Sequence, residues 1–307
     1  MRQAIASIVL LMCAMPAVAD GLFLRGAAEV DDEGGYWVLG RLAGDLGAAT
    51  RWSASLSRSD VDDPLADSDT TTANARLTRA FGPVALELGG RWWRYADAVA
   101  ARVLRTGVTF EGERGYVGVA GEFRRSDFEP FAVATLVDLG NGTIVPVTAT
   151  ADCDLDDRSV GIHAGWFGAR WHVMGEFVSH DYDAASCGFD SPGLERLMRA
   201  RRDVFVQLAG RVTANLSRSA ARRVTEDNAF LDHRWGIAAG IEGARLGYRL
   251  RYDRAEEVFA GLVSETYTFG VSIPRASGTV IDLYAGATSS DGLDTAALVG
   301  VSIDLAL

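Results

Sequence analysis

Apolar and polar side chains alternate along most of this chain, in stretches of about ten residues that end at turn residues. In the stretch 245–252, leucine and tyrosine alternate with glycine and arginine, and 204–213 shows a similar alternation. Successive side chains of a strand point to opposite faces, so each stretch predicts a strand with one apolar and one polar face. Because the pattern runs to the last residue, we predict an all-β chain that forms a closed antiparallel barrel in a bilayer, where closure satisfies every backbone polar group.

The first 19 residues are typical of a cleaved signal peptide. Arg2 provides a positive charge, 5–14 is apolar, and 17–19 read Ala-Val-Ala, a small-residue cleavage site. No later stretch is long and apolar enough for a membrane helix. No linker or shift in composition divides residues 20–307, so we expect a single barrel domain there.

Short and long connections alternate along the chain, as in barrels with short periplasmic turns and longer outside loops. Short turns are predicted at 44–47, 81–83, 113–115, 140–142, 167–169, 242–244 and 274–278. Longer loops are predicted at 31–35, 59–69, 95–101, 125–130, 151–158, 181–203, 226–233, 254–261 and 289–294. With an additional strand near 220–225, this threading gives about 16–18 strands and places both termini in the periplasm.

Charged side chains on the polar faces are expected to line a water-filled lumen. The expected lining residues are Arg51, Arg76, Glu87, Arg105, Glu122, Glu176, Arg211, Glu242, Arg249, Arg251 and Asp282. On the apolar faces, Trp166 and Trp171 flank one short turn, which is typical of the aromatic girdle at a membrane interface. The alternative is the solvated face of soluble sheets, and the consistently apolar opposite faces argue against it.

The final strand carries Gly300, Ile303, Leu305 and Leu307, and it resembles the signal that outer-membrane barrels present to their assembly machinery. Leu307 stands where that signal usually has an aromatic residue. Together with the leader, the strand rhythm and the alternating connections, this strand makes 20–307 resemble a Gram-negative outer-membrane porin.

The porin resemblance implies an outer-membrane channel for passive diffusion of small hydrophilic solutes and ions. It implies outer-membrane lipid and the barrel-assembly machinery as partners, and a homotrimer is common in that family. It also implies a long loop that folds into the lumen. The candidate is 181–203, because 193–202 has the pattern of a short amphipathic helix, and a solvated outside loop is the alternative.

Charge and cysteines add two expectations. The net charge is −11, which argues against nucleic acid as a partner, and all 30 basic residues are arginine. Cys153 and Cys187 remain once the leader is removed. In an oxidising compartment they can form a disulfide, and two free thiols are the alternative.

The run 179–183, Ser-His-Asp-Tyr-Asp, is the one suggestive catalytic sequence. A histidine there acts as a general base if a carboxylate orients it. Adjacent strand residues point to opposite faces, so a serine–histidine pair would need a second strand. We therefore expect no enzyme, and a barrel hydrolase (protease or lipid-modifying) or a non-conducting structural barrel remain alternatives. The acidic stretches 60–69 and 152–157 lack the ligand pattern of a calcium loop, so we expect no metal or cofactor.

Overall fold

The computed structural model describes residues 21–32, 34–60, 69–95, 98–138, 144–183, 186–189, 230–258, 261–275, 278–291 and 295–306. The strands are β1 (Phe23–Asp31), β2 (Tyr36–Asp45), β3 (Thr50–Asp60), β4 (Thr70–Phe81), β5 (Val84–Tyr95), β6 (Val99–Gly112), β7 (Gly115–Asp138), β8 (Ile144–Phe167), β9 (Trp171–Tyr182), β10 (Ser186–Phe189), β11 (Leu231–Ile241), β12 (Gly247–Glu257), β13 (Val263–Pro274), β14 (Val280–Ser290) and β15 (Ala296–Ala306). No helix in these ranges is long and apolar enough to cross a membrane.

The strands form a closed antiparallel barrel of 14 strands. Each strand from β1 to β8 pairs with the next, β1 pairs with β15, and β9 completes the ring by pairing with both β8 and β11. The short strand β10 pairs with β8 beyond the last residue pair of β8 and β9. Closure leaves the barrel strands without an open edge, which confirms the predicted fold class.

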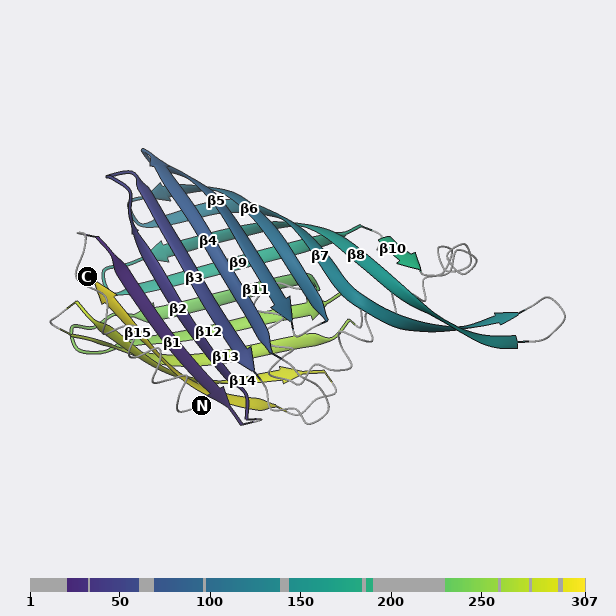
Figure 1. Ribbon diagram of the computed structural model, residues 1–307. Coiled ribbons are helices and arrows are strands. Elements are labelled where there is room, and N and C mark those ends of the chain that lie inside the picture. The colour runs from purple at the N-terminus through teal and green to yellow at the C-terminus, as the bar shows by residue number, and fades with distance from the viewer. Residues whose placement is uncertain are drawn as a thin grey trace.

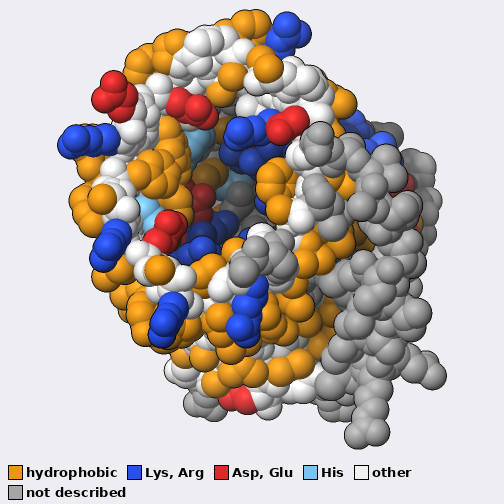
Figure 2. All heavy atoms as spheres, turned by 90° about the vertical axis from the view of Figure 1, so that its left-hand side faces the viewer, with side chains coloured by type: hydrophobic (Ala, Val, Ile, Leu, Met, Phe, Trp, Pro, Cys, Tyr) orange, Lys and Arg blue, Asp and Glu red, His pale blue; other side chains and the backbone are white. Residues whose placement is uncertain are grey.

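The two faces of the wall differ as the alternation predicted. On β5, Leu88 is 53% exposed on the outer wall, whereas Trp93 on the opposite face is 2% exposed. Figure 2 looks into one end of the barrel and shows a hollow whose wall carries arginine, carboxylate and histidine side chains, with hydrophobic side chains around the outside. Because directly paired residues share a face, the register carries this division from strand to strand.

The two ends of the barrel differ in their connections. Only Gly82 and Pro83 separate β4 from β5, and similarly short turns follow β2, β6, β8, β11 and β13. The start of β1 and the end of β15 lie at this same end, which we call the short-turn end (left in Figure 1). We call the opposite end the loop end.

β7 and β8 are each 24 residues long and project from the loop end as one hairpin (Figure 1). The threading was wrong here, because the predicted loops 125–130 and 151–158 lie within these strands. The residues that flank the predicted short turn at 140–142, Asp138 and Ile144, pair with each other at the far tip of the hairpin, opposite the short turns.

Polar composition misled the prediction at this hairpin. Arg125 donates to Asp154 on the facing strand at 2.6 Å, so charges typical of a loop are paired across the ladder. The strand number therefore falls from about 16–18 to 14, since the predicted extra strands merge into β7 and β8 and since β9 pairs directly with β11. The leader 1–19, the loop segment 190–203 and the predicted strands at 204–213 and 220–225 lie outside the described residues.

Candidate functional site

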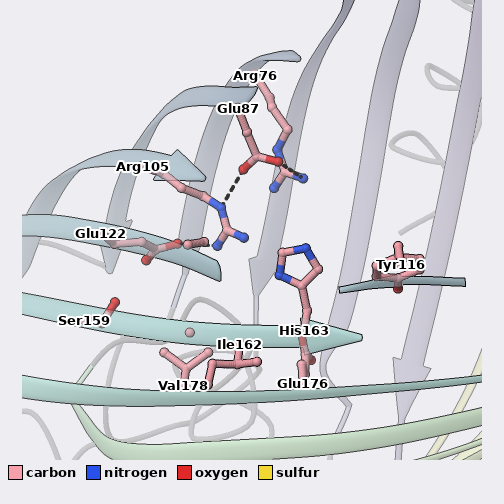
Figure 3. Close-up of a pocket in the computed structure, with 12 residues that line it drawn as sticks. Arg76, Glu87, Arg105, Tyr116, Glu122, Ser159, Ile162, His163, Glu176 and Val178 are labelled. Carbon is pink, nitrogen blue, oxygen red and sulfur yellow. Dashed lines mark hydrogen bonds and ion pairs between the residues drawn. The ribbon is translucent and has the colours of Figure 1, made fainter. Parts of the chain in front are cut away.

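A chain of charges of alternating sign crosses the interior wall from β4 to β7 (Figure 3). Arg76 Nη1 lies 3.4 Å from Glu87, and Arg105 Nε donates to the same carboxylate at 2.7 Å. Arg105 Nη1 also donates to Glu122 at 2.8 Å, and Arg91 Nη2 donates to Glu122 at 3.1 Å. Three guanidinium groups thus share these two carboxylates.

A second group of charges lies on β9, β11 and β12. Glu176 accepts from Arg234 at 3.1 Å and from Arg251 at 2.9 Å. Asp253 accepts from Arg234 at 2.9 Å and from Arg251 at 2.7 Å. The four side chains form a ring of alternating charge, in which each carboxylate accepts hydrogen bonds from both arginines.

A cavity of about 240 Å³ lies between these two groups. Its lining residues are Arg76, Glu87, Arg105, Tyr116, Ala120, Glu122, Ser159, Gly161, Ile162, His163, Glu176 and Val178. His163 projects from β8 between the two charged groups, and its Nε2 lies 3.1 Å from the hydroxyl of Thr109 (Figure 3). The cavity is therefore polar, and it faces a wall of fixed charges.

The structure brings together most of the residues predicted to line the lumen. Sequence reasoning missed Arg91, Arg234 and Asp253. Arg91 and Asp253 lie an even number of residues from Glu87 and Arg251 on their strands, whereas Arg234 lies on β11, where no lining residue was predicted, and pairs with Ala255 and Val178. An alternation count extended along β5 from Glu87 would have found Arg91.

The remaining predicted lining residues lie elsewhere. Asp282 accepts from the hydroxyls of Ser272 and Ser302 on neighbouring strands, and Arg249 is exposed on the same face of β12 as Arg251. Arg51 and Glu242 are at the short-turn end, with side chains 84% and 80% exposed, so they belong to the rim of the barrel rather than to its inner wall. Arg211 lies outside the described residues.

Aromatic side chains fill part of the interior toward the loop end. The ring of Phe230, just before β11, lies 6.1 Å from that of Trp93 and 5.9 Å from that of Phe128. Trp93 stacks on Tyr95 at 6.4 Å, and all four residues are at most 5% exposed. Phe230 has a φ of 58°, an uncommon value for a bulky residue, so packing holds it in a strained backbone conformation. These four residues, the aromatic cluster, narrow the interior at this level.

Cys153 and Cys187 are joined by a disulfide, and they are directly paired in the ladder between β8 and β10. The prediction placed both in outside loops, whereas Cys153 lies within β8 with its side chain fully buried. The bond ties the chain that follows β9 to the base of the projecting hairpin.

The other predicted features lie in the wall. Trp166 and Trp171 are 56% and 47% exposed on either side of the turn between β8 and β9. Gly300, Ile303 and Leu305 lie in β15, which pairs with β1 and β14, and Leu307 lies outside the described residues. No cluster of three or more metal-ligating side chains occurs in the described ranges.

Solved structures share the fold at very low sequence identity. CdiB from Acinetobacter baumannii is 8% identical with a TM-score of 0.50, and the match covers 94% of this chain but only 60% of the CdiB chain. The Pseudomonas putida toluene transporter TodX is 10% identical, with 96% and 93% of the two chains covered and a TM-score of 0.49. Outer-membrane expressed OmpT of Vibrio cholerae is 8% identical, with 95% and 99% covered and a TM-score of 0.46. No protein-family model and no curated protein matches the sequence. The chain has the fold of an outer-membrane β-barrel.

Proposed function

We propose that the protein is a channel of the Gram-negative outer membrane through which small hydrophilic solutes and ions diffuse passively. The observation that carries the proposal is the contrast between an apolar outer wall and a charged interior wall with the ionic groups around Arg105 and Arg251. An apolar outer face suits lipid, and fixed charges inside a barrel suit water and polar solutes. On this proposal the short-turn end faces the periplasm.

The channel is narrow, because the aromatic cluster of Trp93, Tyr95, Phe128 and Phe230 occupies the interior near the loop end. Hydrophobic constrictions limit the passage of water and ions. The pathway would therefore combine a charged section open to the periplasm with an apolar constriction toward the outside. A homotrimer remains a prediction that chemical crosslinking of the native membrane would test.

Planar-bilayer recording of the refolded full-length protein tests the channel directly. We expect discrete, small single-channel steps in KCl, because the constriction sets the current. Absence of steps at every voltage, from protein that shows a folded β-sheet spectrum, would contradict the channel and favour a non-conducting structural barrel.

A further inference from the structure

The neighbouring strand β8 supplies the serine and the carboxylate that His180 lacks within the run 179–183. Ser159 on β8 is the direct cross-strand partner of His180 on β9, so the two side chains share the interior face. Asp157 lies two residues before Ser159, and both of its carboxylate oxygens are 3.2 Å from His180 Nδ1. We propose that Ser159, His180 and Asp157 form a serine-hydrolase site in the barrel interior, which cleaves small esters that enter from the short-turn end.

The three residues differ in their access to the cavity. All are buried, at 5% exposed for Ser159, 3% for Asp157 and 7% for His180, but only Ser159 lines the 240 Å³ cavity. The serine hydroxyl is thus the member of the set that a solute in the cavity reaches first. The imidazole and the carboxylate lie behind it, as general-base catalysis requires.

His180 presents one ring nitrogen for proton transfer. Its Nδ1 faces Asp157, and its buried Nε2 has no hydrogen-bond partner among the described residues. In the tautomer that donates Nδ1–H to the carboxylate, Nε2 is an acceptor. A buried acceptor without a partner is costly, and a serine hydroxyl that turns toward it would remove that cost. The Ser159–His180 hydrogen bond is not formed in this conformation, and such bonds commonly tighten only when substrate binds.

Two arginines, Arg124 and Arg105, lie near the site on the side of β6 and β7. Arg124 Nε lies 3.9 Å from Asp157, with both side chains almost fully buried. Glu122 pairs with Ser159 across the sheet and holds Arg105, which also lines the cavity. Figure 3 shows Ser159 and Arg105 on facing sides of this space. Arg105 uses Nε and Nη1 for Glu87 and Glu122, which leaves further N–H donors for a developing oxyanion or for an anionic group on the ester.

The reaction is a balanced acyl transfer to water. Ser159 Oγ attacks the ester carbonyl while its proton moves to His180 Nε2, and the alcohol leaves with that proton as the acyl group stays on Oγ. Water then attacks the acyl carbon, again giving a proton to Nε2. The carboxylic acid leaves, and the proton returns to Oγ. The proposal revises the expectation that the chain is not an enzyme, and it does not depend on conduction through the aromatic cluster.

Covalent labelling of the refolded full-length chain with a small dialkyl fluorophosphate tests the site. We expect one phosphoryl adduct per chain on Ser159, with loss of fluoride, located by peptide mass spectrometry. Ser159→Ala should abolish the adduct, whereas Ser179→Ala, on the opposite face of β9 beside His180, should leave it unchanged. His180→Gln and Asp157→Asn should each slow labelling about 100-fold or more. No adduct on the folded wild-type barrel, or equal labelling of Ser159→Ala, overturns the proposal.

A thiol variant covers the case in which the variants of buried His180 and Asp157 do not fold. Ser159→Cys retains side-chain size, and a nearby histidine promotes thiolate formation. Iodoacetamide should therefore alkylate Ser159→Cys at a lower pH than Ser57→Cys, which lies on β3 in the same interior. Matching pH profiles for the two thiols would show that His180 does not activate position 159. Bilayer recording of Ser159→Ala separates the two proposals, because conduction should persist when labelling is lost.

Discussion

Phe230 and Trp93 meet edge to face inside the barrel, with ring centroids 6.1 Å apart and an interplanar angle of 69°. Phe230 precedes β11 and Trp93 lies on β5, so the contact joins parts of the wall that are not neighbours in the sheet. Such a contact across the interior restricts the path of a solute between them.

Truncation of Phe230 should open the channel. Phe230→Ala removes the ring that lies between Trp93 and Phe128, so single-channel conductance in KCl should rise above that of the wild type. Phe269→Ala is the matched control, because Phe269 is 51% exposed on the outer wall. If both variants conduct like the wild type, the constriction lies elsewhere.

Ion selectivity should lean weakly toward anions despite the acidic net charge. Arg249 faces the interior and has no ion pair among the described residues, so its charge acts on passing ions. In a KCl gradient, Arg249→Ala should shift the reversal potential toward that of potassium. Arg51→Ala removes an 84% exposed rim arginine that solvent screens, and it should shift the potential less. Strong cation selectivity that both variants preserve would contradict this assignment.

Loss of Glu122 should destabilise the barrel. Its carboxylate is 6% exposed and accepts from Arg91 and Arg105, so Glu122→Ala leaves two partly buried guanidinium groups without this partner. Removing one member of a buried ion pair costs about 3–5 kcal/mol. Urea unfolding in lipid vesicles measures the change, and Arg51→Ala should cost only about 0–1 kcal/mol. Equal stability of the two variants would show that the charge chain does not hold the wall together.

The disulfide should contribute measurably to stability. The Cys153–Cys187 bond closes a loop with a sequence separation of 34, for which chain-entropy arguments give about 3–4 kcal/mol. The double variant Cys153→Ser with Cys187→Ser should unfold at a correspondingly lower urea concentration than the oxidised wild type. Thiol counting on denatured, unreduced protein gives an independent measure, and two reactive thiols per chain would refute the bond.

Surface labelling should distinguish the two ends of the barrel. In a background without the native cysteine pair, Asp138→Cys at the hairpin tip should react with an impermeant maleimide on intact cells. Ala48→Cys, in the turn between β2 and β3, should react only after the outer membrane is permeabilised. The opposite pattern would invert the proposed orientation.

Local pattern was sufficient for most strands, because side-chain alternation is a property of each strand by itself. The turns at 44–47, 81–83 and 167–169 were found because glycine or proline lies there. The prediction was wrong at 125–130 and 151–158, where polar residues resemble loops. Their ion pairs form between neighbouring strands, and the sequence of one strand does not indicate which strand lies opposite.

The candidate sites were also predictable only in part, since alternation gives the face of a residue but not its contacts. Alternation placed Glu87 and Arg105 on the interior face, but only the register shows that they share a hydrogen bond. The run 179–183 identified His180, whereas Asp157 and Ser159 come from β8 through strand pairing. The aromatic cluster was not predicted, since Trp93 and Phe230 are far apart in the chain and carry no shared motif.

An all-β chain with an apolar and a charged face follows from the sequence alone, because both depend only on the period of side chains along a strand. The strand number, the long hairpin of β7 and β8, the constriction at Phe230 and the set of Ser159, His180 and Asp157 emerge only in the folded barrel. Those features depend on which residues meet across the sheet and across the interior. Barrel closure fixes these contacts by satisfying the backbone of every barrel strand on both sides.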